Sequence, residues 1–126
     1  MTLDRSLIHS PTESDESFIE EGCFILEIWN RPEDPALSIA RARVGPGERT
    51  RLHRLVGVVE RYLILAGTGM LEVEGLAPQR VGPGDLVYIP SSAAQRIEND
   101  GDRDLIFLAL CTPRFTPEVY QDIESA

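Results

Sequence analysis

The sequence predicts an all-β fold, a barrel or sandwich built from short strands. Apolar runs of strand length, rich in Ile, Val, Leu, Phe and Tyr, recur at short intervals from about residue 18 onward. Turn signals separate them, among them two Gly-Pro-Gly sequences at 45–47 and 82–84. Internal segments lack the periodicity of an amphipathic helix. This pattern is typical of a closed or two-layered β fold rather than of alternating strands and helices.

The chain divides into a polar arm at 1–17 and one domain at 18–126. The arm is rich in serine and acidic residues, and we expect it to be loose or to order only against a partner chain. A chain of 126 residues has the size of one domain with one buried core. Within that domain, strands are expected at 23–30, 36–44, 50–56, 58–66, 69–75, 85–90, 94–99 and 104–111.

A short C-terminal helix is expected at 117–123. Thr116 is a suitable N-cap, and Pro117 suits the first helical position because its φ is already fixed near the helical value. Val119 and Ile123 would share one face of this helix. The helix would then cover one end of the sheet.

Composition narrows the classes of partner. The chain carries 21 acidic and 12 basic residues, a net charge of −9, so nucleic acid and anionic membrane surfaces are unfavourable partners. It has no apolar run of membrane-helix length, and its first residues lack an apolar signal core, which predicts a cytoplasmic protein. Cys23 and Cys111 each lie in an apolar run; a disulfide between them is conceivable, but two buried, reduced thiols are the favoured interpretation.

Two stretches of the chain carry a recognisable pattern. The first places Gly47, His53, Glu60 and Gly67 along the sequence GERTRLHRLVGVVERYLILAG. The second places Gly84, Pro90, Gln95 and Asn99 along GDLVYIPSSAAQRIEN. Together the two stretches resemble the paired signature motifs of the cupin superfamily, with Gly47, His53, Glu60, Gly67, Gly84, Pro90 and Asn99 at the spacing of that family.

The resemblance implies a double-sheet jelly-roll barrel, open at one end, with a pocket inside. It also implies a divalent metal held by two His and one Glu from the first motif and one His from the second. Here those positions are His53, Leu55, Glu60 and Gln95, so two of the four ligands differ. Leu55 offers no donor, and Gln95 offers only a neutral amide oxygen. Ser92 replaces the glycine of the second motif.

Three interpretations of His53 and Glu60 remain open. With Gln95 they would form a weak metal site, suited to Mn, Mg or Ca more than to zinc, iron or copper. Alternatively, His53 and Glu60 would form a metal-free hydrogen-bonded pair that raises the histidine pKa and provides an acid or base near neutrality. In the third interpretation they only satisfy each other in a polar pocket. His9 could reach a neighbouring subunit's pocket, although a histidine in a polar arm is usually solvated.

Strand alternation extends the candidate pocket. If His53 points into the barrel, Arg51 and Leu55 share its direction, and Glu60 shares its direction with Tyr62. Arg51 could then bind a substrate carboxylate, or strand bending could expose it on a solvated edge. Tyr62 could donate a hydrogen bond to a bound oxygen or simply pack in the core.

These residues favour a protein that binds a small polar or anionic molecule in the barrel, with a metal optional. The alternative is a metal-dependent enzyme of dioxygenase or isomerase type that uses His53, Glu60 and Gln95. A third hypothesis is a purely structural or regulatory partner. The fold alone does not distinguish an enzyme from a binder, because one scaffold hosts many functions. A homodimer is expected, because the 18–30 strand would otherwise leave an unpaired edge.

Overall fold

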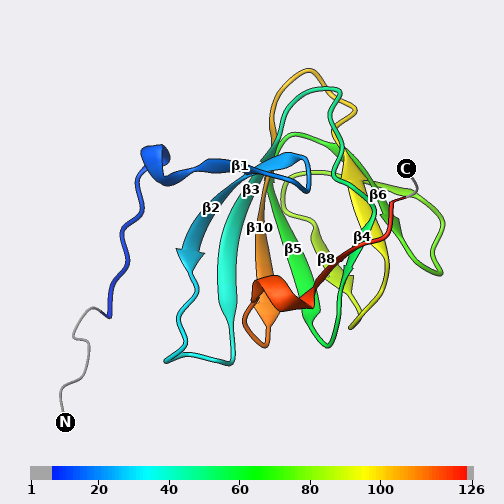
Figure 1. Cartoon of the computed structure of the whole chain (residues 1–126). Coiled ribbons are helices and arrows are strands. Elements are labelled where there is room, and N and C mark those ends of the chain that lie inside the picture. Colours follow the sequence, from blue (N-terminus) through cyan, green and yellow to red (C-terminus); the bar gives the residue numbers. More distant parts are fainter. Residues whose placement is uncertain (1–6, 125–126) are drawn as a thin grey trace, which may run out of the picture.

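Two antiparallel sheets face each other in the computed structural model, which describes residues 7–124 (Figure 1). The first sheet has the order β1-β2-β3-β10-β5-β8 and the second the order β11-β4-β9-β6-β7. The strands of the first sheet are β1 Ser17–Ile19, β2 Cys23–Trp29, β3 Ser38–Val44, β10 Leu105–Thr112, β5 Val59–Ala66 and β8 Leu86–Ile89. Those of the second are β11 Tyr120–Asp122, β4 His53–Leu55, β9 Gln95–Glu98, β6 Gly69–Val73 and β7 Gln79–Val81. The predicted all-β, two-sheet architecture is therefore confirmed.

The core lies between the sheets and follows from strand alternation. In β5 and β6, buried residues alternate with less buried ones, as expected when one face of each strand packs against the opposite sheet. Tyr62 and Phe107, the two largest fully buried side chains among the described residues, pack together with ring centroids 4.3 Å apart. Burial of an apolar side chain of this size contributes roughly 1.5–3 kcal/mol, so the core supplies most of the folding free energy.

Strand register brings three polar residues side by side on the inner face of the first sheet. Cys111 of β10 lies opposite Ser38 of β3 on one side and Glu60 of β5 on the other. In the second sheet, His53 of β4 lies opposite Gln95 of β9. The two motifs are therefore neighbours in space although they lie far apart in the sequence.

Each of the eight predicted strand runs contains a strand, but several strands are shorter than expected. The run 50–56 contracts to His53–Leu55, and three short strands were not predicted: β1, β7 and β11. Cys23 and Cys111 are buried and free, as the favoured interpretation had it. No helix within residues 7–124 is long and apolar enough to span a bilayer.

The predicted C-terminal helix at 117–123 is wrong in its extent. Only a 3₁₀ turn, η2 (Pro117–Val119), forms, and the chain then continues as β11 along the open edge of β4. Thr116 makes no side-chain cap bond. The backbone N–H of Ile123 donates to the carbonyl of Leu52 at 3.0 Å. Pairing satisfies the unpaired backbone groups at the edge of β4, and this outweighs a weak helical preference over one or two turns.

The described part of the N-terminal arm is attached to its own domain. A 3₁₀ turn, η1 (Glu13–Asp15), precedes β1 (Figure 1). Two arm carboxylates pair with arginines on the outer face of β3. Glu13 lies 2.6 Å from Arg41, and Glu16 lies 2.6 Å from Arg43. Residues 13–17 therefore do not form the loose arm that composition predicts, and residues 1–6 lie outside the described part of the chain.

Candidate functional site

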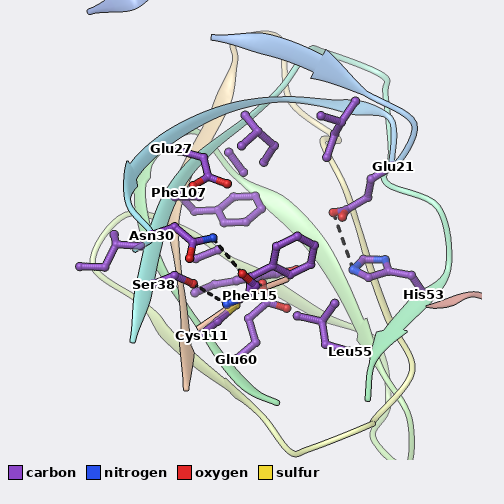
Figure 2. Close-up of a pocket in the computed structure, with 17 residues that line it drawn as sticks. Glu21, Glu27, Asn30, Ser38, His53, Leu55, Glu60, Phe107, Cys111 and Phe115 are labelled. Atoms are coloured by element: carbon purple, nitrogen blue, oxygen red, sulfur yellow. Dashed lines mark hydrogen bonds and ion pairs between the residues drawn. The ribbon is translucent and has the colours of Figure 1, made fainter. Parts of the chain in front are cut away.

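A cavity of about 160 Å³ lies between the two sheets (Figure 2). Its lining comes from β1, β2, β3, β4, β5 and β10, from the turn between β1 and β2, from the residue that follows β2, and from the loop that precedes η2. One part of the lining is apolar: Ile19, Ile25, Ile39, Ala40, Ala42, Leu55, Phe107, Ala109 and Phe115. The other part carries polar groups: Glu21, Glu27, Asn30, Ser38, His53, Glu60, Tyr62 and Cys111.

His53 presents a hydrogen-bond acceptor to this cavity. Its side chain is almost fully buried, and its Nδ1 lies 2.6 Å from the carbonyl oxygen of Arg51. A carbonyl can only accept, so Nδ1 carries the proton and Nε2 keeps its lone pair. Burial lowers the pKa of His53, which keeps the ring neutral at neutral pH. Tyr120 of β11 stacks on the imidazole with ring centroids 5.3 Å apart, which further fixes its orientation.

Glu60 is a buried carboxyl group on β5. Gln95 Nε2 donates to Glu60 Oε1 at 2.7 Å, and the thiol of Cys111 lies 3.8 Å from Oε2. Burial, reinforced by the charge of Glu21, raises the pKa of Glu60 to about 7. The group is therefore poised between its two protonation states near neutral pH.

Glu21 is the residue of this site that sequence reasoning missed. It lies in the turn between β1 and β2, and its Oε2 is 3.7 Å from Nε2 of His53 (Figure 2). Burial raises its pKa to about 7. The sequence offers only a weak signal, because Glu20 and Glu21 read as an ordinary acidic turn ahead of an apolar strand. Only the fold shows that one of these two side chains turns inward.

Gln95 and Tyr62 support the site from behind. Tyr62 OH donates to Oε1 of Gln95, and the amide nitrogen of Gln95 donates to Glu60. Both side chains are nearly fully buried, and Gln95 does not line the cavity, whereas Tyr62 does. Gln95 thus orients the carboxyl group of Glu60, and its amide oxygen is already used by the tyrosine.

Arg51 does not point into the barrel, which corrects the expectation from strand alternation. Its side chain is exposed, and its Nε donates to Oδ2 of Asp122 at 2.6 Å. The physical reason is that β4 begins only at His53, so residues 51 and 52 do not follow the alternation of the strand. The alternative of a solvated edge position describes Arg51 correctly.

The expected hydrogen bond between His53 and Glu60 is also absent from the described contacts. The carboxyl group nearest to His53 Nε2 is that of Glu21, and the pKa of the histidine is lowered rather than raised. Desolvation of the imidazole outweighs the charge of Glu60. His9 lies elsewhere, with Nδ1 2.8 Å from the carbonyl of Ile28.

The donor set does not fit the metal that the motif resemblance implies. Leu55 occupies one ligand position without a donor atom, and Gln95 has its amide oxygen on Tyr62. Within residues 7–124, no three His, Cys, Asp or Glu side chains lie close enough together to hold a metal ion. The residues present at these four positions therefore do not form the metal site of the motif.

Three residues fix the loop that closes the cavity. Asn30 Nδ2 donates to the carbonyl of Phe115 at 2.9 Å, and the backbone N–H of Phe115 donates to Ser38 Oγ at 2.9 Å. Arg114 Nη1 donates to Asn30 Oδ1, also at 2.9 Å. These bonds hold the Phe115 ring over the cavity (Figure 2). Sequence reasoning gave no role to Asn30 or Ser38, because neither belongs to a motif.

Both the sequence and the fold of this chain are similar to those of known proteins. The family described as Cupin domain matches residues 40–111, which include His53, Glu60 and Gln95. An uncharacterised protein of Methanocaldococcus jannaschii is 33% identical over 87 residues, which cover 69% of each chain. A Thermotoga maritima protein named oxalate-binding protein is 37% identical over 71 residues, 56% of this chain and 58% of that protein.

Solved structures give the same architecture. The crystal structure of a predicted oxalate decarboxylase from Thermotoga maritima superposes with a TM-score of 0.70 at 27% identity, covering 90% of this chain and 99% of the other. A protein of Klebsiella pneumoniae with a double-stranded β-helix domain superposes with a TM-score of 0.76, covering 96% of this chain and all of the other. Its 12% identity restricts that likeness to the fold.

Proposed function

Because the chain belongs to the cupin family, whose domain matches residues 40–111, we propose that it binds a small polar molecule inside its barrel. Cavity size supports a ligand of about six non-hydrogen atoms, since an engineered cavity of about 150 Å³ is known to hold benzene. The cavity here measures about 160 Å³. Binding would bury nearly the whole ligand, as is usual for small-molecule sites.

One observation carries the proposal: buried polar groups with unused hydrogen-bonding capacity face a cavity that is otherwise apolar. The Nε2 atom of His53 makes no hydrogen bond among the described contacts, although the side chain is only 1% exposed. Glu60, 7% exposed, uses one oxygen for Gln95 and has only a thiol near the other. Buried polar groups normally find partners, and a bound polar molecule would supply them here.

The names of the Thermotoga maritima matches suggest oxalate as a candidate ligand. Oxalate has a suitable size, but its two negative charges would meet Glu21 and Glu60. Among the described residues, no arginine or lysine lines the cavity. Burial of an anion without a counter-charge is strongly unfavourable. We therefore favour a polar ligand over an anionic one, within the range that the sequence predicts.

Binding can be tested by ligand-observed NMR with a library of small polar fragments. We expect hits whose affinity falls at least tenfold in Glu60→Gln and His53→Ala. The control is Glu20→Gln, which removes one acidic charge from an exposed side chain next to Glu21. Fragments that bind the parent and both site variants equally well would contradict the proposal.

Metal content is measured separately, by elemental analysis of protein purified without chelators. Stoichiometric metal that is lost in His53→Ala would support the metal-dependent alternative, and its retention in that variant would place the metal elsewhere. The proposal of a polar ligand does not depend on this outcome.

We also propose a homodimer. Support comes from the outer face of the first sheet, where β5 and β8 pair with Leu63 opposite Leu86. Leu65, Leu86 and Tyr88 of these strands are 46%, 66% and 57% exposed. Exposed apolar groups on adjacent strands are typical of interaction surfaces. Sedimentation of the parent protein should give a mass of twice the 14.0 kDa of one chain. The variant Leu86→Glu should shift the equilibrium toward the monomer. A parent protein that sediments as a monomer at micromolar concentration would contradict this proposal.

A further inference from the structure

The polar wall of the cavity offers more hydrogen-bond acceptors than donors. Tyr62 donates its hydroxyl proton to Gln95, so this donor is used. Asn30 gives one of its two amide N–H groups to Phe115, and the hydroxyl of Ser38 accepts from the backbone of Phe115 and keeps its own proton. The thiol of Cys111 is a weak donor that already lies beside Glu60. One N–H of Asn30 and the hydroxyl proton of Ser38 are therefore the donors that remain for the cavity among the described contacts.

Above about pH 7, where Glu21 and Glu60 are ionised, most of the free hydrogen-bonding groups are acceptors. His53 directs an unpaired Nε2 into the cavity, because its Nδ1 donates to the backbone. Glu60 retains acceptor capacity on Oε2, and Glu21 lies 3.7 Å from the imidazole without a hydrogen bond to it. A ligand that satisfies these atoms must bring donors. An anion or an ether would leave them unpaired, at a cost of about 1–3 kcal/mol for each buried group.

The charge of the wall has the same sign throughout. Glu21, Glu27 and Glu60 contribute three carboxyl groups, and the described residues place no basic side chain among the lining. Of the arginines near the closing loop, Arg114 donates to Asn30 and does not line the cavity. A positively charged donor would therefore gain both hydrogen bonds and charge pairing in a site of low polarity.

The remaining lining indicates what kind of cation fits. Ile25, Leu55, Phe107 and Phe115 present aliphatic and aromatic surface opposite the carboxyl groups. This surface favours a ligand with a carbon body, and aromatic rings add attraction for a cation. A bare metal ion would leave the apolar surface uncovered, and its donor set is incomplete, as shown above.

Building on the proposed small-molecule function, we propose that the ligand is a small organic ammonium ion. Its N–H groups donate to Glu21, His53 Nε2 and Glu60, and its carbon body packs against Leu55, Phe107 and Phe115. An ammonium has three donors and no acceptor, which is the complement of this wall. The relatives' names point to a dicarboxylate, so this chain would differ from them in the charge of its ligand.

The test compares probes of one shape and different charge. Isothermal titration at about pH 8, where a primary amine is protonated, uses cyclopentylamine, cyclopentanol and oxalate with the intact protein. We expect cyclopentylamine to bind at least tenfold more tightly than cyclopentanol, and oxalate not to bind. Glu60→Gln and Glu21→Gln should each reduce the preference for the amine, whereas Glu20→Gln, in the same turn, should retain it. Each variant is checked for folding by circular dichroism.

The possible results distinguish a failure of the ammonium inference from a failure of the proposed small-molecule function. If cyclopentanol binds as tightly as cyclopentylamine and both are lost in His53→Ala, the cavity binds small molecules but the ammonium inference is overturned. If oxalate binds and the amine does not, the inference is likewise overturned. If a divalent metal added alone binds and prevents amine binding, the cavity is a metal site and the inference fails. If neither the amine, the alcohol nor any fragment binds, the proposed function fails with it.

Discussion

Replacement of Glu60 by glutamine should stabilise the protein at neutral and alkaline pH. In the folded chain, burial raises the pKa of this carboxyl group from its ordinary value of 4.5 to about 7. The folded state therefore binds the proton more tightly than the unfolded state does. The contribution of this bound proton to the free energy of unfolding is fully present below about pH 4.5. It decreases as the pH rises toward 7, and the protein stays less stable above pH 7. The difference between the two values corresponds to about 3 kcal/mol.

Glutamine removes the ionisation but keeps an oxygen that can accept from Gln95. The variant should therefore match the parent near pH 4 and exceed it above pH 7 by up to about 3 kcal/mol, or roughly 10 °C in Tm for a domain of this size. Urea unfolding at a series of pH values measures both curves. Glu20→Gln should leave the difference between low and high pH unchanged. Parallel curves for the parent and Glu60→Gln would show that Glu60 does not titrate as argued.

Three further predictions concern positions away from the cavity. Gly67→Ala should lower the free energy of unfolding by roughly 3 kcal/mol or more, because a Cβ at this φ of 77° would lie 2.5 Å from the carbonyl oxygen of Asp104. The control Gly57→Ala has a similar φ of 76° but open space around the Cβ, and should lower it by about 1 kcal/mol. Equal losses for the two variants in urea unfolding would contradict the steric argument. Asn99→Ala should lower the free energy of unfolding by about 2–4 kcal/mol in the same assay, because the fully buried amide donates to two backbone carbonyls. A change no larger than the experimental error would contradict this structural role of Asn99. Arg51→Ala should bind the NMR fragments with the same affinity as the parent protein. A reduced affinity would show that Arg51 contributes to ligand binding.

The fold could be predicted because its turns and motifs are local features of the sequence. Glycine at 47, 67 and 84 takes a positive φ in the structure, which other residues rarely adopt. Asn99 ties the loop at Arg103 to the end of β3 by accepting and donating hydrogen bonds. Because few residue types can take these backbone positions, the positions can be recognised by their spacing in the sequence. The C-terminal segment was not predictable in this way, because its strand depends on an open edge formed far away in the sequence.

The site was predictable only in part, for a related reason. His53, Glu60 and Gln95 were found through motif spacing, and strand register does bring them together. Glu21 was missed because nothing in its local sequence separates it from Glu20. Arg51 was misplaced because alternation was extended two residues beyond the true start of β4. Which group accepts and which donates also depends on the tertiary contacts, and these determine the chemistry of the cavity.

The final strand has a practical consequence for how the protein is handled. Its Tyr120 covers the imidazole of His53, and the backbone N–H of Leu52 donates to the carboxylate of Glu124. The segment that forms β11 therefore covers one face of His53. A truncation after Val119 would remove the Tyr120 ring and the pairing of β11 with β4, and would expose the histidine to water.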